Sequence, residues 1–413
     1  MAAVSPARFV DCDRLWARHM ALARFGARED GGVDRPALSA VESDARGQLV
    51  TWARELGLSP FTDRMANLFL RLEGREANLA PVLAGSHIDS QPTGGKFDGA
   101  FGVLAALEAV QAIIASGERP FRPIEIVAWA NEEGSRFAPG MPGSEVFTGR
   151  KTLEEAYASC DQAGILQGDA VRDVLRRDAD VPLREFGFPV AAYVEPHIEQ
   201  GPLLEAARVP IGIVTGIQGT RRYRVRVTGE AAHAGTALRA ARRDALMAAV
   251  RMIADIDRAA LDPDDIKLTV GLFKVTPNAP SVVPSEVLFS IDLRHPENDI
   301  VDEMDREIRR IVETKRGPCD VDIRQIAHAP SLTFAREVRS LIAAAAASEG
   351  IRAMEIYSAA GHDSRQLHYV CQTGMIFIPC RGGISHNPAE WAEPQDIAAG
   401  AKVLANVIWQ LAS

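Results

Sequence analysis

The chain has 413 residues, and 46 Lys and Arg against 55 Asp and Glu give a formal net charge of −9. This acidic balance argues against a nucleic-acid partner, because nucleic-acid binding requires a basic face. Hydrophobic residues make up 47% and charged residues 24% of the chain, which is the composition of a globular protein of two or three domains and not of a disordered one.

Neither a membrane span nor a secretory signal is expected. No stretch approaches the roughly 20 apolar residues that a span requires, and Arg14, Arg18 and Arg24 interrupt the apolar start of the chain. The five cysteines are scattered and form no CxxC pair. We therefore expect no disulfide framework, no thiolate metal site and a cytoplasmic location.

The first strong pattern is helical. Ser39 and Glu42 form a capping-box pattern, apolar residues including Val41 and Leu49 follow at helical spacing, and Gly57 ends the helix. From residue 79 short apolar runs alternate with amphipathic helices, which indicates an α/β sheet.

Three predicted strands of this α/β region run into polar side chains. They cover residues 79–84, 124–130 and 191–197, with a helix at 102–117 and short helices between 139 and 189. His87 and Asp89 follow the first strand, Glu132 and Glu133 follow the second, and His197 ends the third. The ligand crevice of an open α/β sheet lies beyond the carboxyl ends of its strands, so these residues can converge there.

Residues 213–329 have a different pattern and are predicted to form a separate domain. Strands at 220–230, 268–275, 285–295 and 319–326 and helices at 241–260 and 300–314 give the order β-α-β-β-α-β of a split βαβ sandwich. Strict alternation in these strands indicates a sheet with one open face, which often serves for dimerisation. Residues 1–212 and 330–413 then form one discontinuous α/β domain, with a helix at 335–350, strands near Met354 and at 374–380, and a closing helix from Gln395.

The polar residues at the strand ends are typical of a metal site. Asp98 follows His87 by eleven residues in a glycine-rich turn that can fold its carboxylate back, and His386 lies in GGISHNP near the end of the chain. Three imidazoles with three or four carboxylates are the ligands that a pair of divalent metals needs.

Each of these signals has a simpler interpretation. A lone histidine at a strand end is more often structural, and a Glu-Glu pair is usually on the surface. The glycine-rich turn lacks the order GxxxxGK of a phosphate loop. Only the joint placement of these residues at successive strand ends favours two metals. His362, in AAGHDS, is intermediate, and we interpret His19, His295, His328 and His368 as structural or surface residues.

The sequence resembles the hydantoinase/carbamoylase family of amidases, which belongs to the clan of metal-dependent aminoacylases and carboxypeptidases. Its members include N-carbamoyl-L-amino acid hydrolases, β-ureidopropionases and allantoate amidohydrolases. The resemblance covers almost the whole chain and rests on the blocks GSHIDSQPTGGKFDGAFGVLAALE, NEEGSRF, VEPHIEQGPLLE, TGIQGTRRYRVRVTGEAAHAGT, VTPNAPSVVP, IDLRHP, AAGHDS and MIFIPCRGGISHNPAEW. It implies a homodimer whose α/β catalytic domain holds a dinuclear site and carries an inserted βαββαβ lid or dimerisation domain.

The resemblance also implies a role for each residue of the site. His87, Asp98 and His197 would bind one metal, and Asp98 would bridge to a second metal held by Glu133 and His386. Zn²⁺, Mn²⁺, Co²⁺ and Ni²⁺ all suit nitrogen and oxygen ligands.

Glu132 takes the position of the general base, and Asp89 that of the carboxylate that orients His87. Four further residues would contact the substrate, the last three of them from the lid: Gln200, His233, Asn278 and Arg294. His233 would stabilise the oxyanion.

Some positions depart from the usual family motifs. HAGTALR replaces the more common HAGTTPM, Ser90 replaces a threonine, and Pro196 replaces a leucine. None of these changes removes a ligand, but Leu238 and Arg239 can alter specificity.

The resemblance implies hydrolysis of an N-carbamoyl-L-amino acid, or a similar ureido acid, to the amino acid, ammonia and CO₂. Three alternatives stay open: an allantoate or ureidoglycine amidohydrolase, an aminoacylase or dipeptidase, and a metal-binding protein without catalysis.

Arg294 has two interpretations. Strand alternation places it beside Asp292, which favours a surface ion pair, whereas the resemblance makes it the residue that binds the substrate carboxylate.

Overall fold

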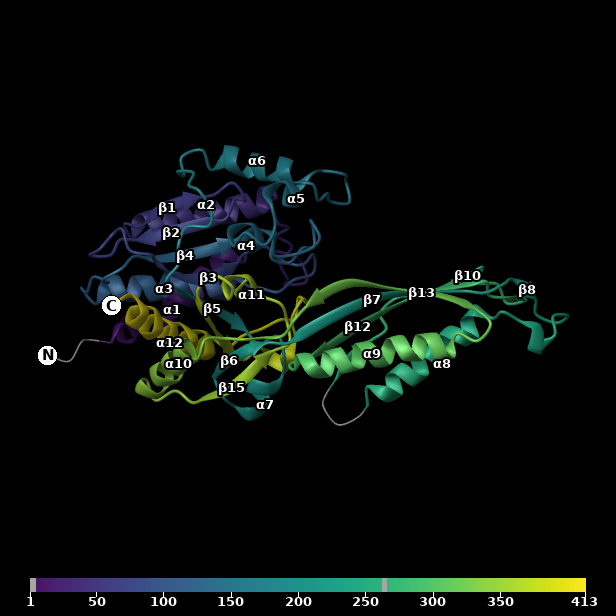
Figure 1. Cartoon of the computed structure of the whole chain (residues 1–413). Helices are drawn as coiled ribbons and strands as arrows, with labels where there is room; N and C mark the ends of the chain where they lie inside the picture. The colour runs from purple at the N-terminus through teal and green to yellow at the C-terminus, as the bar shows by residue number, and fades with distance from the viewer. Residues whose placement is uncertain (1–4, 262–265) are drawn as a thin grey trace. The chain divides into compact units, whose positions relative to one another are not determined.

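The structure is a computed structural model that describes residues 5–261 and 266–413 (Figure 1). The chain divides into two units, the first formed by Met1–Thr215 with Phe334–Ser413 and the second by Gly216–Thr333. None of the described helices is long and apolar enough to cross a membrane. All five cysteines are free thiols.

The first unit is built on a nine-stranded sheet among the described residues, in the order β1-β2-β4-β3-β5-β16-β6-β14, with β15 paired to β6. Its strands are β1 (Ser59–Thr62), β2 (Leu68–Leu72), β3 (Val82–His87), β4 (Ile124–Trp129), β5 (Ala192–Ile198), β6 (Ile211–Ile217), β14 (Leu332–Thr333), β15 (Ala353–Ser358) and β16 (Gln372–Ile378). The four central strands, β4, β3, β5 and β16, are parallel. Their carboxyl ends therefore lie along one edge of the sheet.

Helices cover both faces of this sheet. They are α1 (Cys12–Leu22), α2 (Ala40–Glu55), α3 (Ala100–Ala115), α4 (Pro142–Phe147), α5 (Leu153–Tyr157), α6 (Gln167–Arg177), α7 (Leu203–Ala207), α10 (Arg336–Ser348), α11 (Ser364–Leu367) and α12 (Pro394–Ala412). Two 3₁₀ helices, η1 (Pro6–Phe9) and η3 (Arg381–Gly383), complete the unit. The predominantly apolar helix α3 packs on the sheet beside α12 in the main core.

Most predicted elements of the first unit are confirmed, with three local corrections. The first strand begins later than predicted, at Val82, and ends at His87. The Ser39 side chain caps α2 by accepting the N–H of Glu42, but the reciprocal bond of a capping box is not formed. The Glu42 carboxylate instead accepts the N–H of Leu38, because this side chain is turned into the core. Val41 is exposed, so the buried face of α2 is rotated from the predicted one.

The second unit contains an antiparallel sheet in the order β10-β12-β7-β13, with β9 also paired to β12. Its elements are β7 (Gly219–Thr228), β8 (Ala232–His233), η2 (Arg239–Ala241), α8 (Ala245–Ala259), β9 (Lys267–Thr269), β10 (Phe273–Thr276), β11 (Val282–Val283), β12 (Glu286–His295), α9 (Asn298–Lys315) and β13 (Asp320–Ala329). The strands β8 and β11 form a separate pair. This order of strands and helices confirms the split βαβ fold.

The prediction of a single strand at 268–275 is wrong in one respect, because the structure divides this segment into β9 and β10. Thr269 pairs with Asp292 and Phe273 with Phe289, so four steps on one side match three on the other. Leu272 fills the irregularity by exchanging hydrogen bonds with the backbone and hydroxyl of Ser290. An extra residue of this kind is a bulge, which interrupts regular pairing.

Alternation along β12 is confirmed. Val287, Phe289 and Ile291 are buried in the core of the second unit with residues of α8 and α9. The opposite face carries charged cross-strand pairs, among them Arg222 with Asp292.

Candidate metal centre

The parallel strands of the first unit bring the predicted polar residues to one edge of the sheet. His87 is the last residue of β3 and His197 lies next to the end of β5, while Glu132 and Glu133 follow β4. His386 lies in the loop between β16 and α12. The convergence expected at the carboxyl ends of such strands is therefore present.

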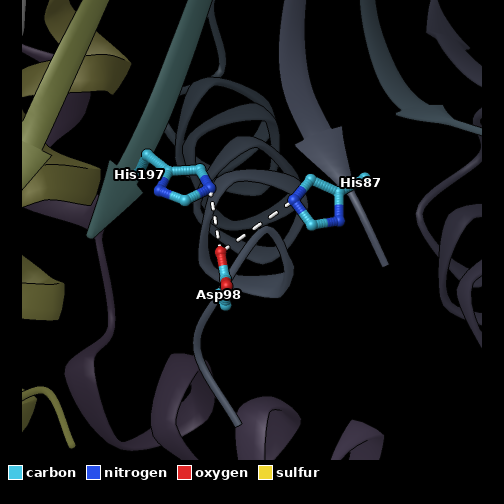
Figure 2. A group of neighbouring side chains, drawn as sticks. All are labelled: His87, Asp98 and His197. Carbon is cyan, nitrogen blue, oxygen red and sulfur yellow. Dashed lines mark ion pairs between the residues drawn. The ribbon is translucent and has the colours of Figure 1, made fainter. Parts of the chain in front are cut away.

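Asp98 lies between the two strand-end histidines, and Figure 2 shows both rings turned toward its carboxylate. Its Oδ1 is 3.2 Å from Nε2 of His197 and 4.0 Å from Nε2 of His87. All three side chains are buried. Each residue offers one ligand atom, and these atoms lie within 4.8 Å of one another. We call His87, Asp98 and His197 the first metal group.

The other oxygen of Asp98 belongs to a second cluster. Its Oδ2 is 3.2 Å from Nε2 of His386, and that nitrogen is 3.5 Å from Oε2 of Glu133. These ligand atoms also lie within 4.8 Å of one another, and Asp98, Glu133 and His386 are called the second metal group. A carboxylate that turns one oxygen to each group has the arrangement of a bridging ligand.

The hydrogen bonds of the buried histidines suit metal binding. Nδ1 of His87 donates to the carbonyl of Asp89 at 3.0 Å, and Nδ1 of His197 donates to the carbonyl of Ile198 at 2.9 Å. A carbonyl can only accept, so the proton lies on Nδ1 and Nε2 faces Asp98. Such a bond fixes the tautomer and the ring orientation of a metal-ligating histidine.

The carboxylates also fit a pair of cations. Oε1 of Glu133 is buried without a hydrogen-bond partner among the described residues. Burial raises the pKa of Glu133 to about 7. Burial acts in the same direction on Asp98, but the contacts of its two oxygens with the His197 and His386 rings hold the pKa of that carboxyl well below its usual value. Bound cations supply the positive charge that keeps such a cluster ionised.

Glu132 lies beside the first metal group. Its Oε2 is 3.6 Å from Nε2 of His87, and burial raises its pKa well above the usual value. The carboxylate of Asp89 accepts the backbone N–H groups of Glu132 and Glu133 at 3.2 and 3.1 Å. Oδ1 of Asp89 is 3.4 Å from Nδ1 of His87. Asp89 thus contacts the His87 ring as expected, but its shorter contacts are the hydrogen bonds from the backbone of Glu132 and Glu133.

Gln200 reaches the second metal group from the loop after β5. Its Nε2 donates to Oδ2 of Asp98 at 3.1 Å and lies 3.4 Å from Nε2 of His386. Gln200 and His386 both have positive φ values, of 57° and 54°, which L-residues rarely adopt and which cluster at functional sites.

The remaining predicted residues lie in the second unit. His233 is exposed on β8, and its Nδ1 accepts the N–H groups of Gly235 and Thr236 at 3.0 and 3.2 Å. Asn278 is exposed in the β10–β11 loop with a φ of 57°. Nε of Arg294 contacts Oδ1 of Asp292 at 2.8 Å, the ion pair that strand alternation favours.

Two residues around the metal groups, Gln91 and Glu390, were not predicted from the sequence, and His362 was left undecided. Gln91 donates to Oε2 of Glu133 at 2.8 Å, and the ring of His362 is centred 4.5 Å from that of His197. Glu390 is buried against the Asp98 turn. Each lies inside a sequence block quoted above, but a block does not say which of its residues touch one another.

The chain matches the model of the peptidase family M20/M25/M40 over residues 83–410. The chain belongs to this family. An N-carbamoyl-L-amino-acid amidohydrolase of Rhizobium meliloti is 37% identical, over 100% of this chain and 99% of the relative. An allantoate amidohydrolase of Bacillus subtilis is 33% identical over 95% of each chain.

Solved structures of the M20 family agree with this assignment. A hydantoinase/carbamoylase family amidase from Burkholderia multivorans is 42% identical, with a TM-score of 0.90 over 98% of both chains. The resemblance seen in the sequence is thereby confirmed, as is the α/β fold class.

Proposed function

We propose that this M20 protein is a dinuclear-metal amidohydrolase. It cleaves the carbamoyl C–N bond of an N-carbamoyl-L-amino acid or a similar ureido acid and releases the amino acid, ammonia and CO₂. The observation that carries the proposal is the carboxylate of Glu132, whose side chain is 10% exposed and lies 3.6 Å from His87, a member of the first of two adjoining metal groups. The names of the similar amidohydrolases support the choice of substrate.

The first metal group would hold one ion and the second metal group the other, with Asp98 shared. The nitrogen and oxygen donors suit Zn²⁺, Mn²⁺, Co²⁺ or Ni²⁺. Such ions, when bound, polarise a carbonyl group and lower the pKa of water. Asp89 supports both groups, because it contacts His87 and holds the backbone of Glu132 and Glu133.

Glu132 acts as the general base. It removes a proton from the attacking water and delivers it to the leaving nitrogen, so one carboxylate serves both halves of the reaction. A pKa raised by burial suits this role, because a base works best when its pKa is near the working pH.

The second unit acts as the lid and dimerisation domain, and His233, Asn278 and Arg294 act on the substrate together with Gln200. Since Nδ1 of His233 accepts two backbone N–H groups, the proton of the neutral ring lies on Nε2. That N–H is the donor an oxyanion requires. Arg294 binds the substrate carboxylate through its planar fork.

The working assembly is a homodimer in the cytoplasm. The open sheet face of the second unit and the family resemblance support dimerisation. The free cysteines support a reducing compartment.

A second candidate is allantoate amidohydrolase, since a relative of that name is 33% identical over 95% of both chains. Allantoate is also a ureido acid and would use the same metal groups. Leu238 and Arg239, where the family motif differs, are the positions we expect to decide between the two substrates.

The test is ammonia release by the purified protein with added Mn²⁺. The panel contains N-carbamoyl-L-amino acids, allantoate, N-acetyl amino acids and dipeptides, the last two scored by release of free amino acid. We expect ammonia from at least one ureido acid and loss of activity after chelation. Cleavage of acetyl or peptide substrates alone would favour an aminoacylase or dipeptidase. No turnover with both ions bound would favour a non-catalytic metal protein.

A further inference from the structure

Glu390 lies between the two segments that form the second metal group. It follows His386 in the chain and is only 2% exposed. Its Oε1 accepts the backbone N–H groups of Phe97 and Asp98 at 2.9 and 3.0 Å, and its Oε2 accepts the hydroxyl of Ser385 at 3.0 Å. One carboxylate therefore holds the backbone of Asp98 and the neighbour of His386.

These three bonds connect distant parts of the sequence. Asp98 and Glu390 are 292 positions apart. Hydrogen bonds to a carboxylate are roughly twice as strong as neutral ones, because the acceptor is charged. Asp98 stands in a turn rich in glycine and His386 in an exposed loop, so neither position is supported by a strand or helix of its own.

The Ser385 hydroxyl adds a second effect of Glu390. Its Oγ is 3.3 Å from Oδ2 of Asp98 and accepts the amide of Gln200 at 3.1 Å. A hydroxyl has one proton and can donate it to one acceptor at a time. When that proton goes to Glu390, the lone pairs of Asp98 Oδ2 on this side stay available for a cation.

Gly95 leaves the space that Glu390 occupies. A Cβ at residue 95 would lie 2.1 Å from Oε1 of Glu390 and 2.2 Å from its Cδ. Any other residue at this position must displace the carboxylate. The glycine-rich turn thus has a steric purpose at Gly95, in addition to allowing the chain to fold back.

We propose that Glu390, with the space left by Gly95, is a positioning residue that determines how tightly the second metal group binds its ion. The inference rests on the proposed function, because it requires the two metal groups to bind cations. Glu390 acts through Asp98 and His386 and does not itself contact the substrate.

The experiment measures Co²⁺ binding to the full chain after chelation, by calorimetric titration with elemental analysis as a count. Glu133→Gln identifies the step that belongs to the second metal group. In Glu390→Ala that step should weaken by about 10- to 100-fold, the usual effect of losing a partner of a metal ligand. The step of the first metal group, which keeps both buried histidines, should change less.

Two further variants separate positioning from general destabilisation. Gly95→Ala should weaken the same step although Glu390 is intact, because the carboxylate is displaced. Glu390→Gln should restore it in part, because its amide oxygen can still accept both N–H groups, whereas its NH₂ group cannot accept the Ser385 proton. Glu108→Ala is the matched control: Glu108 is also buried and accepts a backbone N–H, that of Asp11, but lies outside both metal groups.

Co²⁺ affinities equal to those of the wild type in both Glu390→Ala and Gly95→Ala would overturn this inference but would leave the proposed function standing. Equal weakening of both steps, with no restoration by Glu390→Gln, would make Glu390 merely structural. If the wild-type chain binds no Co²⁺, the proposed function fails and the inference fails with it. Should Glu390→Ala not fold, Gly95→Ala and Glu390→Gln decide the matter.

Discussion

Asp98 and Glu132 are carboxylates at the same sheet edge, with side chains 5% and 10% exposed, yet their pKa values move in opposite directions. Contacts with histidine rings lower the pKa of Asp98, whereas burial raises that of Glu132. Carboxylates that differ in this way serve different roles, one permanently charged and one able to carry a proton. At the residue scale, this difference supports the proposed roles of Asp98 as a ligand and Glu132 as a base.

Adjacent residues test this separation. Glu132→Gln should keep both metal ions and lose about 10²- to 10⁴-fold in kcat, the usual effect of removing a general base. Glu133→Gln should instead lower the number of bound ions from two toward one. Elemental analysis and steady-state kinetics of both variants provide the measurement. Equal metal loss in the two variants would contradict the assigned roles.

Arg294 tests whether the enzyme selects carboxylates. A charge-assisted bond to the substrate is worth about 1.5–3 kcal/mol, or roughly 10- to 100-fold in kcat/KM. Arg294→Lys should lose that factor on an acid substrate, because lysine lacks the planar fork. On the matching carboxamide, the wild type should be poor and the variant little worse. An equal loss on acid and amide would make Arg294 a structural residue that pairs with Asp292.

At the scale of elements, the close approach of α3 to the sheet determines where the strand-end histidines lie. Gly102 of α3 faces β3 and β5, and a Cβ there would lie 2.3 Å from the carbonyl oxygen of Pro196 and 2.6 Å from Cβ of Ser86. Those two residues immediately precede His197 and His87. Glycine is therefore required by packing, although it is a poor helix former.

Two glycine-to-alanine substitutions, one on α3 and a matched one on α2, isolate this packing effect. Gly102→Ala should destabilise the protein by about 1–3 kcal/mol through overpacking. Gly47→Ala should stabilise it by about 0.5–1 kcal/mol, because Gly47 is exposed in a helix of equal length and its Cβ would meet nothing within 4 Å. Denaturant unfolding measures both. A stabilising Gly102→Ala would show that α3 can move away from the sheet without cost.

At the scale of the whole molecule, acid stability should depend on His19. This residue is 1% exposed, stacks on Phe101 and has no hydrogen-bond partner for either ring nitrogen among the described residues. Burial lowers the pKa of His19 to about 3. In the unfolded chain the pKa of His19 is near 6.5. Between about pH 6.5 and pH 3 His19 is therefore protonated in the unfolded chain and neutral in the folded one. The free energy of unfolding is highest above about pH 6.5 and falls as the pH decreases.

The expected loss between pH 7.5 and pH 5 is about 2 kcal/mol from this one residue. His19→Leu should remove that part of the pH dependence, whatever its effect on stability at neutral pH. His328→Gln, which changes an exposed histidine of β13, is the control and should leave the acid sensitivity as it is. Denaturant unfolding at the two pH values gives the comparison. An unchanged pH dependence in His19→Leu would show that the unfolded state gains no proton there.

The order of elements in the second unit and the four central parallel strands of the first unit could be predicted from the sequence. The antiparallel strands β1, β2, β6 and β14 were not predicted. Apolar periodicity and glycine positions are local properties, and they placed β4 at Ile124–Trp129 and the βαββαβ order within a few residues of the structure. The same reasoning selected His87, Asp98, Glu132, Glu133, His197 and His386, because residues at the carboxyl ends of parallel strands must meet at one edge.

Which atoms face one another could not be predicted from the sequence and is seen in the folded chain alone. The two oxygens of Asp98 turn to different histidines, Glu42 bonds Leu38 and not its own cap, and Glu390 reaches the Asp98 turn from 292 positions away. The division of one predicted strand into β9 and β10 likewise depends on its register with β12. Periodicity describes one segment at a time, whereas contacts between distant segments are determined when they pack together, and packing depends on the shape of both partners.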